Sequence, residues 1–568
     1  MTNDLLLFLT FLVVLILLAL PLGRYMANVF SLEKTLLDPL FKPIEKLIYR
    51  MTGINSTTEM NWKEYTINLV WFNLFGMAAV YLLQRFQDLL PFNPENLAAV
   101  APWHVAFNTA VSFMTNTNWQ AYGGETTLSY FSQMAGLTVQ NFVSAATGLA
   151  VAVALIRGLT RKTTDKIGNF WVDLVRSTVW VLLPLSVIVT LALVQQGVLQ
   201  NLLPYVTVET LEGAKQTLAM GPVASQEAIK MLGTNGGGFF NANSAHPFEN
   251  PTPLTNLIEI LSIFLIPTAL IFTYGHLVRD KRQGYAILGS MLLLFCFMLG
   301  LIYTAELYGN PVIAGLGVSH PTALEGKEVR FGLGGSALFA TVTTAASCGA
   351  VNTMHDSLTP LGGLIPMLQM MLGEVIIGGV GAGFYGMMLY VFMTVFIVGL
   401  MVGRTPEYLG KKIEAREMKM ATLAILIPAV TILAGSAIAS VTEAGTSSIA
   451  NTGPHGLSEL LYAFASGAGN NGSAFGGLTV NTLFYDLMIA AAMLIGRFGV
   501  IVPVLAIAGS MAEKKISPPG LGTFSSTGTL FVILLAGVVL IFGALTFLPA
   551  LALGPIVEHL LLLQGSTF

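Results

Sequence analysis

Charged residues are scarce in this chain. Only 10% of its 568 residues are Asp, Glu, Lys or Arg, whereas soluble domains usually contain about 25%. Hydrophobic residues make up 54% of the chain, and the mean hydropathy is +0.72. These values exclude a soluble globular protein and indicate a membrane protein with several spans. The net charge of -3 gives no indication of a nucleic-acid partner.

Cysteine is almost absent. Cys296 lies in a hydrophobic run and Cys348 lies beside a glycine, so the chain can form at most one disulfide. This excludes a disulfide scaffold and a thiolate metal site. We expect both thiols to be reduced.

Long apolar runs predict ten membrane spans. The first run, 5–22, is long enough to cross the hydrocarbon core at ~1.5 Å per helical residue. Asp4 precedes this run and Arg24 follows it, which favours a retained anchor with its N-terminus outside rather than a cleaved signal. The ten predicted spans are 5–23, 66–86, 129–156, 173–196, 254–275, 284–304, 378–402, 420–441, 482–510 and 527–550.

The basic residues indicate the orientation. With the N-terminus outside, the cytoplasmic connections are 24–65, 157–172, 276–283, 403–419 and 511–526, and they hold 20 of the 27 Lys and Arg residues. The outer connections hold only Lys215, Lys230, Lys327 and Arg330. This asymmetry follows the positive-inside rule.

Four outer connections share one plan, in which a segment able to form a half-span helix precedes a run rich in Gly, Asn, Thr and Ser. With Gln120, Gly236, Gly349 and Gly472 taken as equivalent points, the chain contains four copies of a unit of roughly 115 residues. The four runs are TNTNWQAYGG from Thr115, TNGGGFFNAN from Thr234, TAASCGAVN from Thr344 and SGAGNNGSAFGG from Ser466.

Irregular backbone at membrane depth must be buried in protein or line a water-filled cavity. We therefore expect the four loops to surround one axis, where their carbonyl oxygens can replace the water around a dehydrated cation. Glycine permits such close approach because it has no Cβ atom. Half-span helices that end at the loops would add partial negative charge, whereas a phosphate cradle needs a helix N-terminus after the glycines.

Three of these motifs resemble one family. TNGGGFFNANSAHPFENPT, TAASCGAVNTMHDSLTPLGG and SGAGNNGSAFGG are similar to segments of the potassium-binding A subunits of bacterial Kdp pumps, which belong to the superfamily of potassium transporters. The resemblance covers the whole chain. It implies an all-α polytopic membrane protein with about ten transmembrane helices. Four membrane-pore-membrane repeats would surround a pseudo-fourfold pore, with one extra N-terminal helix.

The resemblance implies that K+ enters from outside through a filter built by the four loops. The first loop lacks the glycine of the other three and offers Asn118 and Gln120 instead. The implied filter residues are Thr115, Asn116, Thr117, Asn118, Gln120, Thr234, Asn235, Gly236, Gly237, Gly238, Ser347, Cys348, Gly349, Asn470, Asn471 and Gly472.

An energy source is missing from the sequence. A passive pore accumulates K+ roughly fiftyfold per 100 mV, since each charge gains ~2.3 kcal/mol. The chain has no Walker A run, no Asp-Lys-Thr-Gly phosphorylation loop and no cytoplasmic connection above about 42 residues, so it cannot hydrolyse ATP itself. The resemblance implies a P-type ATPase catalytic subunit that uses ATP, with small C and F subunits, in a bacterial inner membrane and in contact with its lipids.

Two charges lie in apolar stretches, Glu374 and Arg497. Such groups are expensive in a membrane unless they face water or a partner. The structural alternatives are a buried pair or a side chain near a helix end that extends to the membrane surface. The resemblance favours a place below the filter for Glu374 and at the entrance of a lateral tunnel for Arg497. The glycine-rich stretch 378–386 predicts either a broken helix or close helix packing.

The expected division of the chain is 1–65, extra helix and connection; 66–156, 173–275, 284–402 and 420–510, pore repeats; and 511–568, C-terminal connection and helix.

Two other functions stay open. A K+ channel or gradient-driven transporter of the same superfamily would not need an ATPase partner. A membrane-embedded enzyme would need clustered acid, base or metal ligands, and five of the seven histidines lie near the outer loops without metal-binding spacing.

Overall fold

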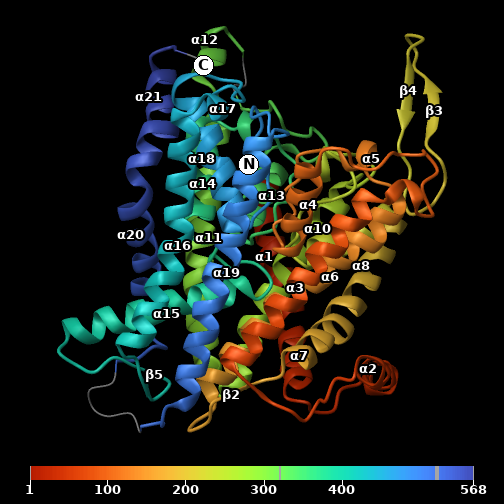
Figure 1. The fold of residues 1–568 in the computed structure, drawn as a ribbon. Helices are drawn as coiled ribbons and strands as arrows, with labels where there is room; N and C mark the ends of the chain where they lie inside the picture. The colour runs from red at the N-terminus through yellow and green to blue at the C-terminus, as the bar shows by residue number, and fades with distance from the viewer. Residues whose placement is uncertain (1, 319–321, 518–523, 567–568) are drawn as a thin grey trace.

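The computed structural model describes residues 2–318, 322–517 and 524–566. Within them, ten helices are long and apolar enough to cross a membrane, and they run side by side as one bundle (Figure 1). All ten predicted spans are confirmed. Their main helices are α1 Thr2–Phe30, α3 Trp62–Arg85, α6 Val139–Thr160, α7 Phe170–Arg176 with α8 Leu183–Gln195, α10 Pro253–Leu277, α11 Lys281–Tyr308, α15 Ala382–Met401, α16 Ala415–Val441, α19 Leu483–Glu513 and α20 Thr529–Leu551.

Four shorter, largely buried helices lie between the spans. Each precedes one of the four loops, as the sequence predicts, and each is shorter than the roughly 20 residues that a transmembrane helix usually needs. They are α4 Trp103–Met114, α9 Val223–Leu232, α13 Gly332–Ala345 and α18 Gly453–Gly469. We call them the pore helices, and we number the loops that follow them loop 1 to loop 4.

The order of elements gives four span, pore-helix, span units. The units are α3–α4–α6, α7/α8–α9–α10, α11–α13–α14/α15 and α16–α18–α19, with α1 before them and α20 after them. Helix α1 packs along α10 because Gly23 lets the two backbones approach, and the hydroxyl of Thr273 donates to Gly23 O over 3.0 Å. The fold is that of a helical membrane protein with four pore repeats and an extra N-terminal helix.

One of the helices that the sequence did not predict lies inside the third repeat. Helix α14, Pro360–Met371, precedes α15 and is separated from it by the non-helical segment 372–381. In this segment Gly373, Gly378 and Gly381 have positive φ, which favours glycine. The expected broken helix is therefore confirmed. Close packing is present as well, because a Cβ atom on Gly381 would overlap Gly148 O in α6.

The remaining elements are short. The strands form three two-stranded antiparallel hairpins or ladders: β1 Met60–Asn61 with β2 Lys166–Gly168, β3 Val206–Glu209 with β4 Lys215–Leu218, and β5 Glu407–Tyr408 with β6 Lys411–Lys412. The hairpin β3–β4 projects from the end of the bundle that also carries α12 (Figure 1). The other short helices are α2 Asp38–Thr52, α5 Gly124–Thr127, α12 Pro311–Gly315, α17 Glu443–Thr446 and α21 Val557–Leu563.

Candidate functional site: four loops around one centre

The four loops share a backbone conformation. In each loop two residues, separated by one residue, have positive φ, so the chain turns in the same way four times. The pairs are Asn116 and Asn118, Thr234 and Gly236, Ser347 and Gly349, and Asn470 and Gly472. Asparagine is the non-glycine residue that adopts this conformation most readily, which explains how loop 1 forms the turn without glycine.

This pattern corrects the repeat point that the sequence analysis chose in loop 1. Asn118, with φ of 56°, is equivalent to Gly236, Gly349 and Gly472. Gln120 lies two residues further along the chain, where its side chain exchanges hydrogen bonds with Gly238 over 3.0 and 3.3 Å. Gln120 therefore connects loop 1 to loop 2 from the side.

The loops are packed against one another in sequence. A Cβ atom on Gly236 would overlap the carbonyl oxygen of Cys348 in loop 3. In the same way, Gly349 is pressed against Asn471 O in loop 4 and Gly472 against Thr117 O in loop 1. Gly237 completes the circuit, because its Cβ atom would overlap Asn118 O. The four loops therefore form a closed ring.

One layer of carbonyl oxygens in this ring has no protein donor. The four residues that directly precede the equivalent positions are fully buried, and their carbonyl oxygens accept no hydrogen bond from the described residues. They are Thr117, Asn235, Cys348 and Asn471. Buried carbonyl groups are nearly always paired with a donor. Four equivalent exceptions therefore indicate a place for a cationic ligand.

Other carbonyl oxygens of the predicted filter are already bonded. Asn116 Nδ2 donates to Thr234 O over 3.0 Å, and Ser347 Oγ donates to Asn470 O over 2.9 Å. Asn470 Nδ2 donates in turn to Thr117 Oγ1 over 2.9 Å. These bonds hold neighbouring loops together. The neighbouring layers are only partly bonded, because the carbonyl oxygens of Asn116, Ser347, Asn118, Gly349 and Gly472 also accept no hydrogen bond from the described residues. The layer that begins at Thr117 differs in that all four of its oxygens are unpaired.

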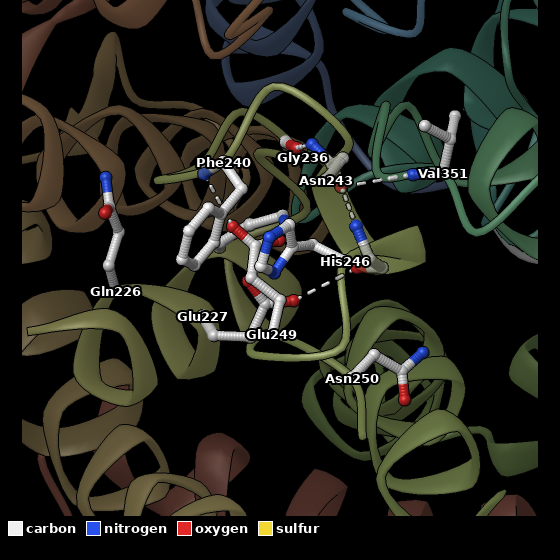
Figure 2. A network of polar contacts seen from close by, with 12 residues as sticks. Gln226, Glu227, Gly236, Phe240, Asn243, His246, Glu249, Asn250 and Val351 are labelled. Atoms are coloured by element: carbon white, nitrogen blue, oxygen red, sulfur yellow. Dashed lines mark hydrogen bonds and ion pairs between the residues drawn. The ribbon is translucent and has the colours of Figure 1, made fainter. Parts of the chain in front are cut away.

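Asn243 also holds neighbouring loops together and was missed by the sequence analysis. Its side-chain amide donates to Gly236 O over 2.7 Å, and its Oδ1 accepts a 3.2 Å bond from Val351 N in the segment after loop 3 (Figure 2). One side chain thus connects two loops. Asn243 also has a positive φ of 55°. The sequence around it, NANS, does not indicate this conformation.

A buried ion cluster lies behind loop 2. Lys230, on the pore helix α9, contacts Glu227 Oε2 at 2.9 Å and Glu249 Oε2 at 2.7 Å, and all three side chains are buried. Glu249 Oε1 also accepts a 2.9 Å hydrogen bond from Phe240 N (Figure 2). The cluster therefore fixes the segment after the glycines to the pore helix before them. In the sequence, the Glu-x-x-Lys spacing on α9 could have indicated the ion pair between Glu227 and Lys230.

The broken segment 372–381 lies directly beneath the ring. Val380 N donates to Thr234 Oγ1 over 3.0 Å, and Glu374 Oε1 accepts from Asn471 Nδ2 over 2.6 Å. Glu374 is therefore next to loop 4. The segment therefore contacts both loop 2 and loop 4.

A cavity of about 90 Å³ opens beside this segment, with room for several water molecules. Glu374 and Arg497 both line it, and no ion pair joins them among the described residues. Arg497 donates instead to Ser144 O over 3.0 Å. The cavity extends between α15, α16, α19 and α20, and other lining residues are Ser347, Asn470, Tyr385, Ile425, Leu426, Phe542 and Thr546.

Asp356, His455 and Glu459 form a group with metal-binding geometry near loops 3 and 4. His455, however, contacts a carboxylate with each ring nitrogen: Asp356 at 2.7 Å and Glu558 at 2.8 Å. Burial lowers the pKa of His455, but these two hydrogen bonds outweigh it and raise the pKa to about 10. The ring is therefore protonated near neutral pH and donates from both nitrogens, which is the opposite of what a metal ligand does.

The comparisons with known proteins agree with this architecture. A sequence model of the potassium-transporting ATPase A subunit (KdpA) matches residues 9–560. The potassium-transporting ATPase potassium-binding subunit of Methylorubrum extorquens is 62% identical over 548 residues, 96% of each chain. The subunit of that name from Koribacter versatilis is 57% identical over 571 residues, again 96% of each chain.

A solved structure supports the fold alone, because the sequences are distant. The potassium transporter TrkH from Vibrio parahaemolyticus superposes with a TM-score of 0.50 at 14% identity, over 86% of this chain and 96% of that one. The near-complete match to the family model and the identity with the bacterial subunits lead to one conclusion: this chain belongs to the potassium-transporting ATPase A subunit (KdpA) family.

Proposed function

We propose that this chain selects K+ at the ring of four loops and translocates it as one subunit of an ATP-driven importer. The layer of unpaired carbonyl oxygens at Thr117, Asn235, Cys348 and Asn471 is the observation that carries this proposal. Neutral carbonyl oxygens suit K+, because they replace its hydration shell without binding it as tightly as carboxylates would. The pore helices end at the ring, and the partial negative charge of their C-termini favours a cation there.

The remaining predicted filter residues have a supporting role in this proposal. They hold the loops at the spacing that K+ requires, through the hydrogen bonds of Asn116, Ser347 and Asn470 and the close packing of the equivalent glycines. The ring faces the outside of a bacterial inner membrane, because the basic connections mark the opposite side as cytoplasmic. K+ is the transported substrate.

We propose further that K+ leaves the ring sideways. In this proposal the segment 372–381, which contacts loops 2 and 4, blocks a straight path through the ring. The cavity beside it is lined by Ser347 and Asn470 near the ring and by residues of α16 and α20. Its outer end is the surface at which a P-type ATPase catalytic subunit would receive the ion. ATP would act only in that partner, in a complex that also contains small C and F subunits.

Copurification distinguishes this function from the alternative of a K+ channel or gradient-driven transporter. We expect the chain, isolated from its native membrane, to retain a large ATPase subunit whose hydrolysis is stimulated by K+ and inhibited by vanadate. The K+ flux into vesicles should then require ATP. Rapid K+ flux through vesicles that contain the purified chain alone would contradict the proposal and support the channel.

Arg497 tests the sideways route. Its guanidinium lines the cavity, and a fixed positive charge there would repel K+ from the cytoplasmic exit. We expect Arg497→Ala to raise the passive K+ leak of vesicles about tenfold and to lower the K+ uptake per ATP hydrolysed, as measured with a K+ electrode and a phosphate assay. Arg497→Lys, which keeps the charge, is the matched control. Unchanged leak and coupling in Arg497→Ala would refute this role.

A further inference from the structure

Helix α2 lies outside the functional site and has an unusual position. It connects the end of α1 at Phe30 to the start of α3 at Trp62, so it lies at the end of the bundle where both spans leave the membrane. Figure 1 shows it almost end-on, while the spanning helices run along the bundle. Helix α2 therefore lies across the bundle axis, in the orientation of a helix that lies along a membrane surface.

One face of α2 is fixed to the protein. Glu45 accepts bonds of 2.8 and 3.1 Å from Arg176 and a 3.1 Å bond from the indole of Trp180. The ring of Phe41 packs edge-on against Trp180, with 5.6 Å between ring centroids. These contacts fix the rotation of the helix about its own axis, and with it the direction of the other two faces.

The second face is apolar and no described residue covers it. Leu40, Ile44, Leu47 and Met51 recur at intervals of four, three and four residues, which places them on one side of a helix. Leu40, Leu47 and Met51 are 60%, 56% and 77% exposed. A row of such side chains on a helix beside two membrane spans is suited to the acyl region of a bilayer.

The third face is basic. Lys42, Lys46 and Arg50 recur every four residues and are exposed. Lys42 contacts Asp38 at 2.5 Å, whereas Lys46 and Arg50 form no ion pair with the residues that the structure describes. Lysine and arginine beside an apolar face extend to the headgroup level, where they meet phosphate groups.

We infer that α2 is a binding site for anionic phospholipid, with Lys46 and Arg50 on the phosphodiester headgroup and Leu40, Leu47 and Met51 among the acyl chains. The charge of the basic face selects an anionic lipid, and the adjacent apolar face selects a lipid over a soluble anion. This inference does not depend on the proposed function, since it uses neither the ring of loops nor the cavity beneath it.

Native mass spectrometry of the full complex tests the headgroup site. Phosphatidylglycerol and phosphatidylcholine with the same acyl chains are titrated against the wild type and the double variant Lys46→Gln/Arg50→Gln. We expect the double variant to bind phosphatidylglycerol roughly 25-fold more weakly, about fivefold for each basic side chain. Phosphatidylcholine binding should not change. Lys46→Arg/Arg50→Lys, which keeps both charges, should bind like the wild type and controls for folding.

A second pair of basic residues provides the matched control. Lys281 and Arg282 are exposed at the start of α11, where Arg282 is paired with Asp280 at 3.0 Å. Lys281→Gln/Arg282→Gln removes the same charge from another place. Equal loss of phosphatidylglycerol in the two double variants would overturn the inference, because it would mean that net charge alone matters. Equal binding by the wild type and Lys46→Gln/Arg50→Gln would overturn it as well.

Photocrosslinking tests what covers the apolar face. Leu47→benzoylphenylalanine is introduced into the full complex in vesicles of phosphatidylglycerol and phosphatidylcholine, and the crosslinked products are identified by mass spectrometry. We expect crosslinks to lipid, with phosphatidylglycerol enriched over its share of the vesicle. A crosslink to a protein chain in place of lipid would overturn the inference and identify α2 as a protein contact.

Discussion

Gly236→Ala is expected to weaken K+ binding by about a hundredfold or more, a loss of roughly 3 kcal/mol. Gly236 has φ of 81°, which disfavours any residue with a Cβ atom. The new methyl group would also overlap Cys348 O, one of the four unpaired oxygens. The ring must then open at the place where K+ would be held, and Na+ and K+ should be discriminated less well.

Isothermal titration of the detergent-purified complex with K+ and with Na+ measures this effect. Gly213→Ala is a matched control, because Gly213 has φ of 80° in an exposed turn with no atom within 4 Å of the added Cβ. It introduces the same backbone strain without the overlap, and we expect K+ affinity to be unchanged. Wild-type K+ affinity in Gly236→Ala would exclude the ring as the K+ site.

The sequence predicted the spans and the loops well, because both depend on local composition. An apolar run of about 20 residues has few alternatives to a transmembrane helix, and four similar polar runs at regular separation imply one repeated unit. Helix α14 escaped the prediction since Pro360–Met371 is too short to span. The break between α14 and α15, at 372–381, can be related to the loops only when the position of the ring is known.

The sequence was less informative about individual contacts. Loop 1 has no glycine at the turn, so the sequence does not show which residue is equivalent to Gly236, and it does not indicate that Asn118 adopts the positive φ of 56°. The bridge made by Asn243 joins segments more than 100 residues apart, so no local pattern predicts it. Which carbonyl oxygens stay unpaired depends on such side-chain donors and required the three-dimensional arrangement.

The sequence also did not predict the ion cluster behind loop 2. It identified Lys230 only as one of the few basic residues outside the cytoplasmic connections. Its burial between Glu227 and Glu249 gives it a larger expected role in stability than any exposed charge. The effect of a buried ion pair on stability is seen mainly when one partner is removed, because the remaining charge is then buried without a partner and the protein is destabilised. The magnitude of this cost is open to direct measurement.

Lys230→Met is expected to lower the free energy of unfolding by about 3–5 kcal/mol, because it leaves Glu227 and Glu249 buried without a counter-charge. It should also weaken K+ binding, since Glu249 would lose the contact that fixes the hydrogen bond to Phe240 N. Urea unfolding of the purified complex, in K+ and in its absence, measures both effects.

The triple variant Glu227→Gln/Lys230→Met/Glu249→Gln separates charge from packing. It removes the cation together with both of its carboxylates while keeping similar side-chain volumes. We expect it to recover most of the stability lost in Lys230→Met, because positions 227 and 249 no longer hold buried charges without a partner, and the new amide oxygen at position 249 can still accept from Phe240 N. If the single and triple variants unfold at the same urea concentration, the ion cluster does not account for the stability of loop 2. The packing of the aliphatic part of Lys230 would then account for it.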